Sequence, residues 1–507
     1  MKRISEKSSI GDLLGRHARA AALLVILLAG GIVHVNCLDN GFVSDDRYLV
    51  VENLERPDSA SWLELFTKPW GAGAGTGFER KMNRGYYRPL TMILIRAQNA
   101  VFGDSPAGYH AVNIALHLLV CALVFLVAAR WLPTPGAFAA GLVFAVHAVH
   151  TEPVNVIFYQ TTLLVSLIAL VSLWIMSRAR SGPGRTAVVV GLFVVALLCK
   201  ESAIVIPGLL LLHEIFLGKR SLKAFLTPLF LILAAVGIAY LTLRFTALEG
   251  QGFSYFEDAP LWSRALTMAG VFALYLRLLA WPFPLCVFYE WTIIPPVEDP
   301  LGQAAVVGVL AVAAYAALVV WTWRRARGRR GSSDRPDRAA VAGFALLFFP
   351  VSILHVMHVV PILNVAAERF IYLGSFAYCL LLGLLFQRAV EAGVSRFARM
   401  GAAAILGIYV ILLAAISVQR NGDWRTDETL CRSTIGHYPQ SLSARVTLTE
   451  ILLERGQIEE ALHHAEIARR VAPWSKRVEQ LERTVRAAAG AFGGTTAPGS
   501  PGPEGNR

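Results

Sequence analysis

Long runs of apolar residues constrain this sequence more than any other feature. Four of them extend over residues 20–35, 107–129, 163–176 and 225–243. Such runs approach or reach the ~20 residues that a helix needs to cross the hydrocarbon core of a bilayer. Only 16% of the residues are charged and 55% are apolar, which a water-soluble fold cannot accommodate on its surface. The sequence therefore predicts an all-α polytopic membrane protein.

The basic residues report orientation rather than a nucleic-acid partner. The net charge is +12, but Lys and Arg gather in short loops between the apolar runs, at Arg178–Arg185, Lys219–Lys223 and Arg324–Arg330. Basic loops of this kind stay on the cytoplasmic side of a membrane. Residues 1–17 are also basic and no small-residue cleavage site follows the first run, so we expect a cytoplasmic N-terminus and a retained anchor.

Threading the chain through the membrane with these loops inside gives a bundle of about eleven crossings. The expected spans are 18–37, 107–130, 136–150, 154–177, 186–199, 201–217, 224–243, 301–323, 339–358, 370–387 and 399–418. A crossing at Ala265–Trp281 would put Arg324–Arg330 outside, so we interpret this segment as re-entrant or as lying on the outer interface. The membrane domain then covers 18–420 and has a long first outer loop at 38–106.

The C-terminal region has the spacing of a helical repeat. Pro439 and Pro473 are 34 residues apart, which is the period of the tetratricopeptide repeat (TPR), and Leu448, Ala461 and Ala468 match its contact positions. This predicts a TPR-like helical domain at 421–489 on the outer face, and the alternative is an unrelated helical hairpin. Residues 490–507 are rich in Gly, Pro, Ser and Thr and predict a disordered tail.

Two adjacent carboxylates, Asp45 and Asp46, follow the first span at its outer end. Repulsion between like charges and partial burial favour proton uptake by one of them, which suits a general base. A solvated loop turn is the alternative interpretation.

Other ionisable residues also gather at outer span ends. His147, His150 and Glu152 occupy one turn, but their spacing falls short of a metal site, which favours hydrogen bonding or substrate contact. Lys200 and Glu201 could form an ion pair or contact a lipid phosphate. The set is completed by three arginines whose planar guanidinium groups suit bidentate binding of a phosphate, or which simply snorkel at the interface: Arg88, Arg277 and Arg369.

In their order along the chain, these motifs resemble those of the transmembrane and tetratricopeptide-repeat O-mannosyltransferase family and its bacterial relatives, within the GT-C class of membrane glycosyltransferases. The likeness covers about residues 20–475. The motifs are Ser44-Asp45-Asp46, Tyr87-Arg88-Pro89-Leu90-Thr91, Tyr109-His110-Ala111-Val112-Asn113, His147-Ala148-Val149-His150-Thr151-Glu152, Lys200-Glu201, Tyr275-Leu276-Arg277, and Glu368-Arg369 with Tyr372.

This resemblance implies a GT-C-like bundle that moves a mannose-like hexose from a polyprenyl-phosphate donor to a hydroxyl acceptor on the outer face, with inversion. It implies that Asp45 or Asp46 is the general base and that the other orients it. The donor phosphate would be held by Arg277, Arg369 and Lys200. The residues expected to shape the site are Arg88, His147, His150, Glu152 and Glu201.

The acceptor stays open between a protein, a glycan and a lipid, because the repeat region is short beside the arrays of the animal proteins. In a bacterium the chain would lie in the inner membrane, use undecaprenyl phosphate and expose the TPR-like domain to a periplasmic protein. A divalent metal ion fits this class, although no residue pattern here indicates one. Two other functions remain as alternatives: a membrane-anchored TPR scaffold and a transporter, which would place its charges near mid-membrane.

Overall fold

The computed structural model describes residues 2–55, 64–67, 86–178, 182–218, 221–247, 256, 259–327, 336–359, 362–391 and 393–493. The chain forms two compact units. The first, the membrane unit, comprises Met1–Leu285 and Pro296–Arg425, and the second, the helical unit, comprises Cys286–Pro295 and Thr426–Arg507. The Gly-rich stretch 71–77 and most of the predicted tail at 490–507 lie outside the described residues.

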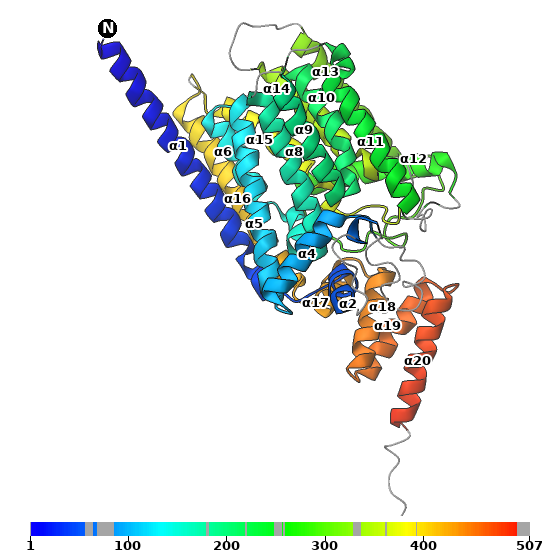
Figure 1. The fold of residues 1–507 in the computed structure, drawn as a ribbon. Coiled ribbons are helices and arrows are strands. Elements are labelled where there is room, and N and C mark those ends of the chain that lie inside the picture. The colour runs from blue at the N-terminus through cyan, green and yellow to red at the C-terminus, as the bar shows by residue number, and fades with distance from the viewer. Residues whose placement is uncertain are drawn as a thin grey trace, which may run out of the picture. The chain divides into compact units, whose positions relative to one another are not determined.

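Every regular element in the described part of the membrane unit is a helix (Figure 1). Seven described segments are long and apolar enough to cross a membrane, and two helices joined by a bend provide an eighth. The seven contain α1 (Lys2–His34), α5 (Pro106–Trp131), α8 (Gln160–Arg178), α12 (Leu261–Ala280), α13 (Gln303–Arg327), α14 (Arg338–Ile353) and α16 (Arg396–Asp423). The shorter apolar helices are α9 (Pro183–Cys199), α11 (Pro228–Ala247) and α15 (Ser375–Ala389). The predicted all-α membrane protein is confirmed, whereas the number of about eleven crossings stays a prediction.

Short helical segments lie between these helices. They are η1 (Val35–Asp39), η2 (Arg47–Val51), α2 (Glu52–Glu55), η3 (Glu64–Phe66), α4 (Pro89–Phe102), η5 (Ile157–Tyr159), η6 (Glu201–Val205), α10 (Ile206–Phe216), η7 (Leu222–Leu226), η8 (Leu354–Val356) and η9 (Glu368–Ile371). Proline starts α4, α5 and α9, where its missing N–H and fixed φ cost nothing. The expected spans 201–217 and 370–387 each begin later than predicted, because η6 and η9 occupy their first residues.

The expected span at 136–150 is broken. α6 (Thr134–Val146) ends at an extended His147, and η4 (Ala148–His150) and α7 (Thr151–Asn155) continue at an angle of 52°. A break at membrane depth requires other groups to satisfy the freed backbone. His150 Nδ1 donates to the Phe144 carbonyl (2.8 Å), and Ser417 Oγ of α16 donates to the Val146 carbonyl (2.8 Å). Side chains from within and far beyond the bend therefore hold it.

Helix α12 corrects part of the interpretation of Ala265–Trp281. It is one continuous helix of 20 residues and not a re-entrant hairpin, and its length and composition would allow a crossing. Near its N-terminal end, Ser263 Oγ donates to the Val297 carbonyl. Near its C-terminal end, the Leu279 carbonyl accepts from His147 Nε2 at 2.9 Å. The placement of α12 on the outer interface stays a prediction.

Helices α6 and α15 approach each other closely at two glycines. A Cβ atom added to Gly136 would meet the Gly383 carbonyl at 2.8 Å, and one added to Gly383 would meet the Gly136 carbonyl at 2.4 Å. Small residues at such crossings let the backbones of membrane helices touch. This contact fixes α15 against the broken span whose bend carries Glu152.

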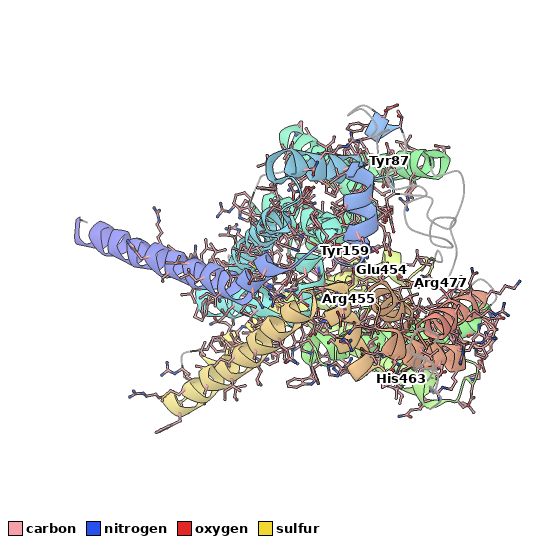
Figure 2. All side chains as sticks on the ribbon, turned by 90° about the horizontal axis from the view of Figure 1, so that it is seen from below. Tyr87, Tyr159, Glu454, Arg455, His463 and Arg477 are labelled. Atoms are coloured by element: carbon pink, nitrogen blue, oxygen red, sulfur yellow. The ribbon has the colours of Figure 1, made fainter. Side chains whose placement is uncertain are left out.

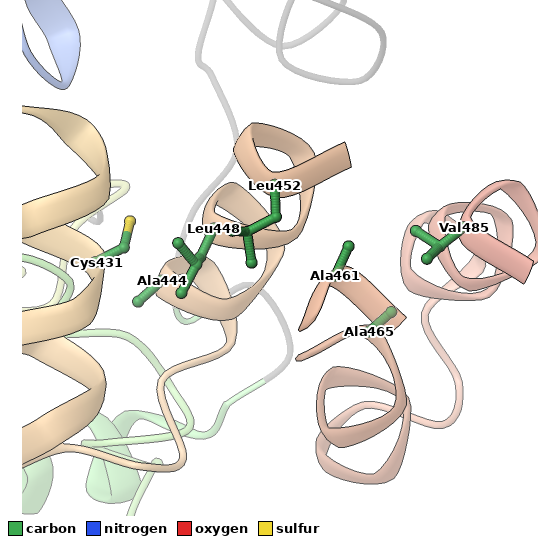
Figure 3. Close-up of a cluster of buried hydrophobic side chains, with 7 residues drawn as sticks. All are labelled: Cys431, Ala444, Leu448, Leu452, Ala461, Ala465 and Val485. Carbon is green, nitrogen blue, oxygen red and sulfur yellow. The ribbon is translucent and has the colours of Figure 1, made fainter. Parts of the chain in front are cut away.

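The helical unit contains four helices that pack in chain order. They are α17 (Asp427–His437), α18 (Leu442–Glu454), α19 (Ile458–Val471) and α20 (Lys476–Gly493). Thr426 and Thr429 form a capping box at the start of α17. The core shared by the four helices consists of small and aliphatic side chains (Figure 3), namely Cys431, Ala444, Leu448, Leu452, Ala461, Ala465 and Val485.

The predicted repeat positions Leu448, Ala461 and Ala468 are all buried. The helix pair α18–α19 occupies the residues expected for it, and Gly456 at φ +73° makes the turn between them. Assignment to the TPR class stays a prediction. The unit also includes the segment 286–295, which sequence analysis placed in the membrane domain. Glu290 in this segment accepts hydrogen bonds from Ser441 Oγ (3.0 Å) and Ser443 N (2.9 Å).

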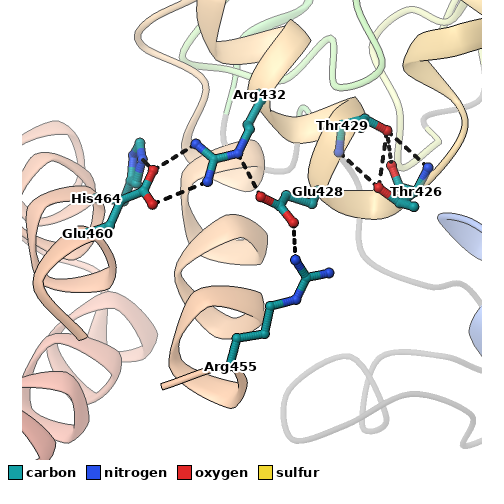
Figure 4. Close-up of polar contacts among 7 residues, drawn as sticks. All are labelled: Thr426, Glu428, Thr429, Arg432, Arg455, Glu460 and His464. Carbon is teal, nitrogen blue, oxygen red and sulfur yellow. Dashed lines mark hydrogen bonds and ion pairs between the residues drawn. The ribbon is translucent and has the colours of Figure 1, made fainter. Parts of the chain in front are cut away.

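Exposed ion pairs join three helices of this unit (Figure 4). Arg432 of α17 donates to both carboxylate oxygens of Glu460 on α19, at 2.7 and 3.2 Å, and to Glu428 at 2.8 Å. Arg455, at the end of α18, pairs with the other oxygen of Glu428. The hydrogen bond from Arg432, followed by the nearby positive charges, lowers the pKa of Glu428 below its usual value.

Candidate functional site

The acidic pair lies just after the first span, on a backbone that is fixed in an unusual conformation. Ser44 has φ +56°, a left-handed value that non-glycine residues seldom adopt and that tends to occur at functional sites. Asp46 is fully buried, and its two oxygens accept from the backbone N–H groups of Ile157 (2.9 Å) and Phe158 (2.8 Å). Asp46 therefore anchors the pair to the start of η5.

Asp45 has a different environment. It is half-buried, and its Oδ2 accepts a hydrogen bond from the Tyr159 hydroxyl at 2.8 Å. No hydrogen bond from a described residue occupies Oδ1. Figure 2 labels Tyr159, whose side chain is buried. Of the two carboxylates, Asp45 is the one whose geometry leaves an oxygen for an incoming group.

Arg369 lies on the other side of Tyr159. Its guanidinium carbon is 4.3 Å from the centre of the Tyr159 ring, and its Nη1 pairs with Glu152 Oε1. The Arg369 backbone N–H also donates to Glu152 Oε2 at 2.6 Å, so Glu152 fixes the start of η9 as well as the side chain. Burial is the largest single influence and opposes the charge of Arg369, but Glu152, Tyr159 and Asp45 together outweigh it and raise the pKa of Arg369 above its usual value. The cation is therefore held, and permanently charged, next to the acidic pair.

A second ion pair is built around Arg88, just before α4. Its Nε and Nη2 donate to both oxygens of Glu201, at 3.1 and 2.7 Å, and Arg244 Nη1 lies 3.7 Å from Glu201. The Arg88 guanidinium stacks on Tyr86, at 4.5 Å, and on Phe158, at 5.3 Å. Burial alone would raise the pKa of Glu201, but the two arginines lower it well below its usual range.

Lys200 connects the two ion pairs electrostatically. Its Nζ donates to Thr162 Oγ1 at 2.8 Å. Burial, followed by repulsion from Arg88, lowers the pKa of Lys200 to about 7, and Glu201 opposes this shift. Arg369 and Glu152 act on the same ammonium group. The structure therefore brings together Asp45, Asp46, Arg88, Glu152, Lys200, Glu201 and Arg369, which we call the outer cluster after the face predicted for it from the sequence.

Arg277 is not brought to the outer cluster. Its guanidinium is exposed and donates to the backbone carbonyls of Phe283 (2.7 Å) and Pro284 (3.5 Å). The Tyr275 hydroxyl, two positions earlier on α12, accepts from the N–H of Ala367 next to η9. Because two positions on a helix differ by about 200°, Arg277 faces the opposite way from Tyr275. Its expected grouping with Arg369 and Lys200 is not found.

His147 and His150 are fully buried and hydrogen-bonded within the protein. His147 Nε2 donates to the Leu279 carbonyl and its Nδ1 accepts from Val149 N (3.4 Å), while His150 Nε2 is hydrogen-bonded to Ser375 Oγ (2.8 Å). Of the two interpretations left open by the sequence, hydrogen bonding is the one observed. These histidines shape the bend that presents Glu152.

Three residues next to the outer cluster were not identified from the sequence as site residues. They are Tyr159, which bridges Asp45 and Arg369, Thr162, which holds Lys200, and Arg244, which supports Glu201. A signal for the first two was present: the polar run Tyr159–Thr162 opens an apolar span, where such residues are unexpected. Nothing in the sequence singles out Arg244 from other arginines at span ends.

No family model matches the chain. In sequence it is similar to named protein O-mannosyl-transferases. It is 25% identical over 458 residues to TMTC3 of Mus musculus, covering 84% of this chain and 48% of that protein. It is 26% identical over 519 residues to Tmtc1 of Drosophila melanogaster, covering 85% and 59%. These matches confirm the resemblance inferred from the motifs, and the chain spans about half the length of the curated relatives it matches.

Solved structures are similar to the chain at low sequence identity. The oligosaccharyltransferase of Archaeoglobus fulgidus is 13% identical, with a TM-score of 0.44 over 87% of this chain and 58% of that one. ArnT of Cupriavidus metallidurans, bound to undecaprenyl phosphate, is 16% identical, with a TM-score of 0.41 over 94% and 78%.

Proposed function

We propose that this chain is a membrane glycosyltransferase that moves a hexose from a polyprenyl-phosphate donor to a hydroxyl group at the outer cluster. One observation carries the proposal. A carboxylate with a free oxygen, Asp45, and a buried, permanently charged guanidinium, Arg369, share a single tyrosine between them. Transfer from a sugar phosphate needs these two groups close together, a base for the acceptor and a cation for the leaving phosphate.

In the proposed reaction, the oxygen of the acceptor hydroxyl attacks the anomeric carbon of the donor sugar. Asp45 takes the proton of that hydroxyl at the same time. The bond between that carbon and the phosphate oxygen breaks on the opposite side, which inverts the configuration. The departing phosphate keeps the electron pair of the broken bond. Arg369, with Lys200, stabilises this developing charge. The hydrogen-bonded pair of Arg88 and Glu201 shapes the site beside them. Asp46 positions Asp45 and does not act on the proton, because both its oxygens are engaged by backbone N–H groups.

The names of the relatives support mannose as the sugar and a protein as the acceptor. We place the outer cluster and the helical unit on the face opposite the basic loops, which is periplasmic if the membrane is a bacterial inner membrane. The helical unit would then meet a protein acceptor or partner there. Its Trp474 is 68% exposed, with its ring centre 5.3 Å from that of Trp291, and offers a first contact surface.

The test compares three single variants of the purified full chain, supplied with polyprenyl-phosphate mannose and a peptide or glycan acceptor. Asp45→Asn should lower kcat by about 10²–10⁴-fold and leave the melting temperature unchanged. Asp46→Asn should lower the melting temperature too, because an amide nitrogen would face a backbone N–H. Asp104→Asn, an exposed acid in the turn between α4 and α5, is the matched control and should behave as wild type.

Mass spectrometry of the acceptor identifies the product and the sugar. Full turnover by Asp45→Asn would overturn the assignment of the base. A wild-type protein that transfers no sugar from any polyprenyl-phosphate hexose, with any acceptor, would overturn the proposed function itself.

A further inference from the structure

A cavity of about 460 Å³ lies in the membrane unit away from the outer cluster. Three helices line it. Arg19 and Leu23 come from α1, Phe125, Leu126 and Arg130 from α5, and Arg178 from the last turn of α8. The size falls within the range of ligand-binding pockets. None of these residues takes part in the proposed transfer.

The cavity lies at the opposite ends of these helices from the outer cluster. Helix α8 begins immediately after Tyr159, which contacts Asp45, and ends at Arg178. Its 19 residues span about 28 Å at 1.5 Å per residue. Likewise, His110 near the start of α5 contacts the Gly41 carbonyl, whereas Arg130 is in its last turn. The cavity therefore lies at the far end of α5 and α8 from the outer cluster.

The polar part of this cavity is strongly cationic. Arg130 Nη2 donates to the Ser177 carbonyl at 3.1 Å, and the Arg178 guanidinium stacks on Trp174 at 4.5 Å. Arg130 also lies within electrostatic range of both Arg178 and Arg19. No ion pair joins any of the three to an acidic side chain of the described residues. Three guanidinium groups that repel one another are thus held around one space.

The rest of the lining is apolar. Leu23, Phe125 and Leu126 form a wall between α1 and α5, two helices that pack side by side (Figure 1). An arginine that only marks the end of a span extends into water independently of its neighbours. Here three exposed arginines from three helices line one cavity that also has an apolar wall. That combination suits a molecule with an anionic head and a hydrocarbon tail.

We propose that this cavity binds an anionic glycerophospholipid of the surrounding membrane. The phosphodiester of its head group would accept hydrogen bonds from Arg19, Arg130 and Arg178, since guanidinium groups match phosphate geometry. The first part of an acyl chain would pack on Leu23, Phe125 and Leu126. Basic pockets between membrane helices are established binding sites for anionic head groups.

The test uses the full chain purified in detergent and reconstituted in nanodiscs of phosphatidylglycerol and phosphatidylcholine. Native mass spectrometry counts the lipids that remain bound to the protein after it is released from the nanodiscs. The wild type should retain phosphatidylglycerol in preference to phosphatidylcholine. The triple variant Arg19→Gln/Arg130→Gln/Arg178→Gln should retain it on the order of 100-fold less strongly, about fivefold for each arginine.

Arg325→Gln is the matched control, because Arg325 also stacks on a tryptophan near a helix end, Trp321 at 5.1 Å, but does not line the cavity. It should retain the lipid as wild type does. A triple Arg→Lys variant, which keeps the charge, should retain an intermediate amount and shows whether the cavity has survived.

Three outcomes would overturn the proposal: equal retention of both lipids by the wild type, unchanged retention by the triple glutamine variant, or the same loss in Arg325→Gln. Inorganic phosphate and glycerophosphoglycerol are added as competitors. If either displaces the lipid at millimolar concentration, the cavity is a site for a soluble phosphate and the assignment to a membrane lipid is wrong.

Discussion

Both units of this protein rely on arginine–carboxylate pairs, but the pairs are placed very differently. In the membrane unit, Arg369 and Glu152 are 10% and 3% exposed, and each partner is fixed by a backbone or aromatic contact. In the helical unit, Arg432 and Glu460 are 41% and 39% exposed. Buried charges are costly to leave unpaired, whereas exposed pairs contribute little to stability. Under the proposed function, the buried pairs serve the transfer reaction, whereas the exposed pairs join helices of the helical unit.

The largest expected effect comes from breaking the buried pair. Arg369→Gln should leave the Glu152 carboxylate unpaired and destabilise the protein by about 3–5 kcal/mol. It should also raise the KM for the polyprenyl-phosphate donor. Thermal melting in detergent and donor titration measure the two effects. Arg369→Lys restores the charge but not the planar guanidinium group. It should therefore recover a larger share of the lost stability than of the lost donor binding. If Arg369→Gln melts at the wild-type temperature, breaking the buried pair costs no more than breaking an exposed one. The distinction between the two kinds of pair would then be wrong.

The second prediction concerns Lys200, whose buried charge should make donor binding depend on pH. Burial, followed by Arg88, lowers its pKa to about 7, so the ammonium is mostly charged at pH 6 and mostly neutral at pH 8. Only the charged form attracts the donor phosphate. The KM for the donor should therefore rise as the pH increases through 7, by about tenfold at most between pH 6 and 8. Lys200→Arg, which stays charged throughout, should abolish the rise, and a pH-independent KM in the wild type would contradict this role.

In the helical unit, Glu428→Gln removes the centre of the exposed network. We expect a loss of about 1 kcal/mol or less, measured as faster hydrogen exchange in α17–α19 of the full chain. The folded pKa of Glu428 lies below the unfolded value, so its contribution is fully present above the unfolded pKa. It is lost as the pH falls through the folded pKa. The variant should therefore lose less protection in acid than the wild type does.

The smallest effect is expected at Arg483, which pairs with Glu479 one turn away on α20 and is 77% exposed. Arg483→Gln should change stability by less than about 0.5 kcal/mol, close to the value for a single pair on a helix surface. Hydrogen exchange of α20 measures it. A loss comparable to that of Arg369→Gln would show that exposure does not separate the two kinds of pair.

The sequence predicted the helical membrane protein because hydrocarbon length and apolar composition act on whole segments. It also identified most of the outer cluster, since charged residues at span ends are expensive and few. It could not separate Asp45 from Asp46, because the difference lies in two backbone N–H groups of η5, more than 100 residues away. For a similar reason it could not show which way Arg277 faces. The direction it faces depends on the rotation of α12, which Tyr275 and Ala367 fix through a contact across the fold.

The broken span formed by α6 and α7 has a consequence for how the protein is made. Helix α6 has 13 residues, about 20 Å, which is too short to cross a bilayer core of about 30 Å alone. The groups that close its bend come from Leu279, Ser375 and Ser417. All of them are synthesised more than 100 residues after His150. During translation the bend therefore lacks its full set of hydrogen bonds until α16 has been synthesised.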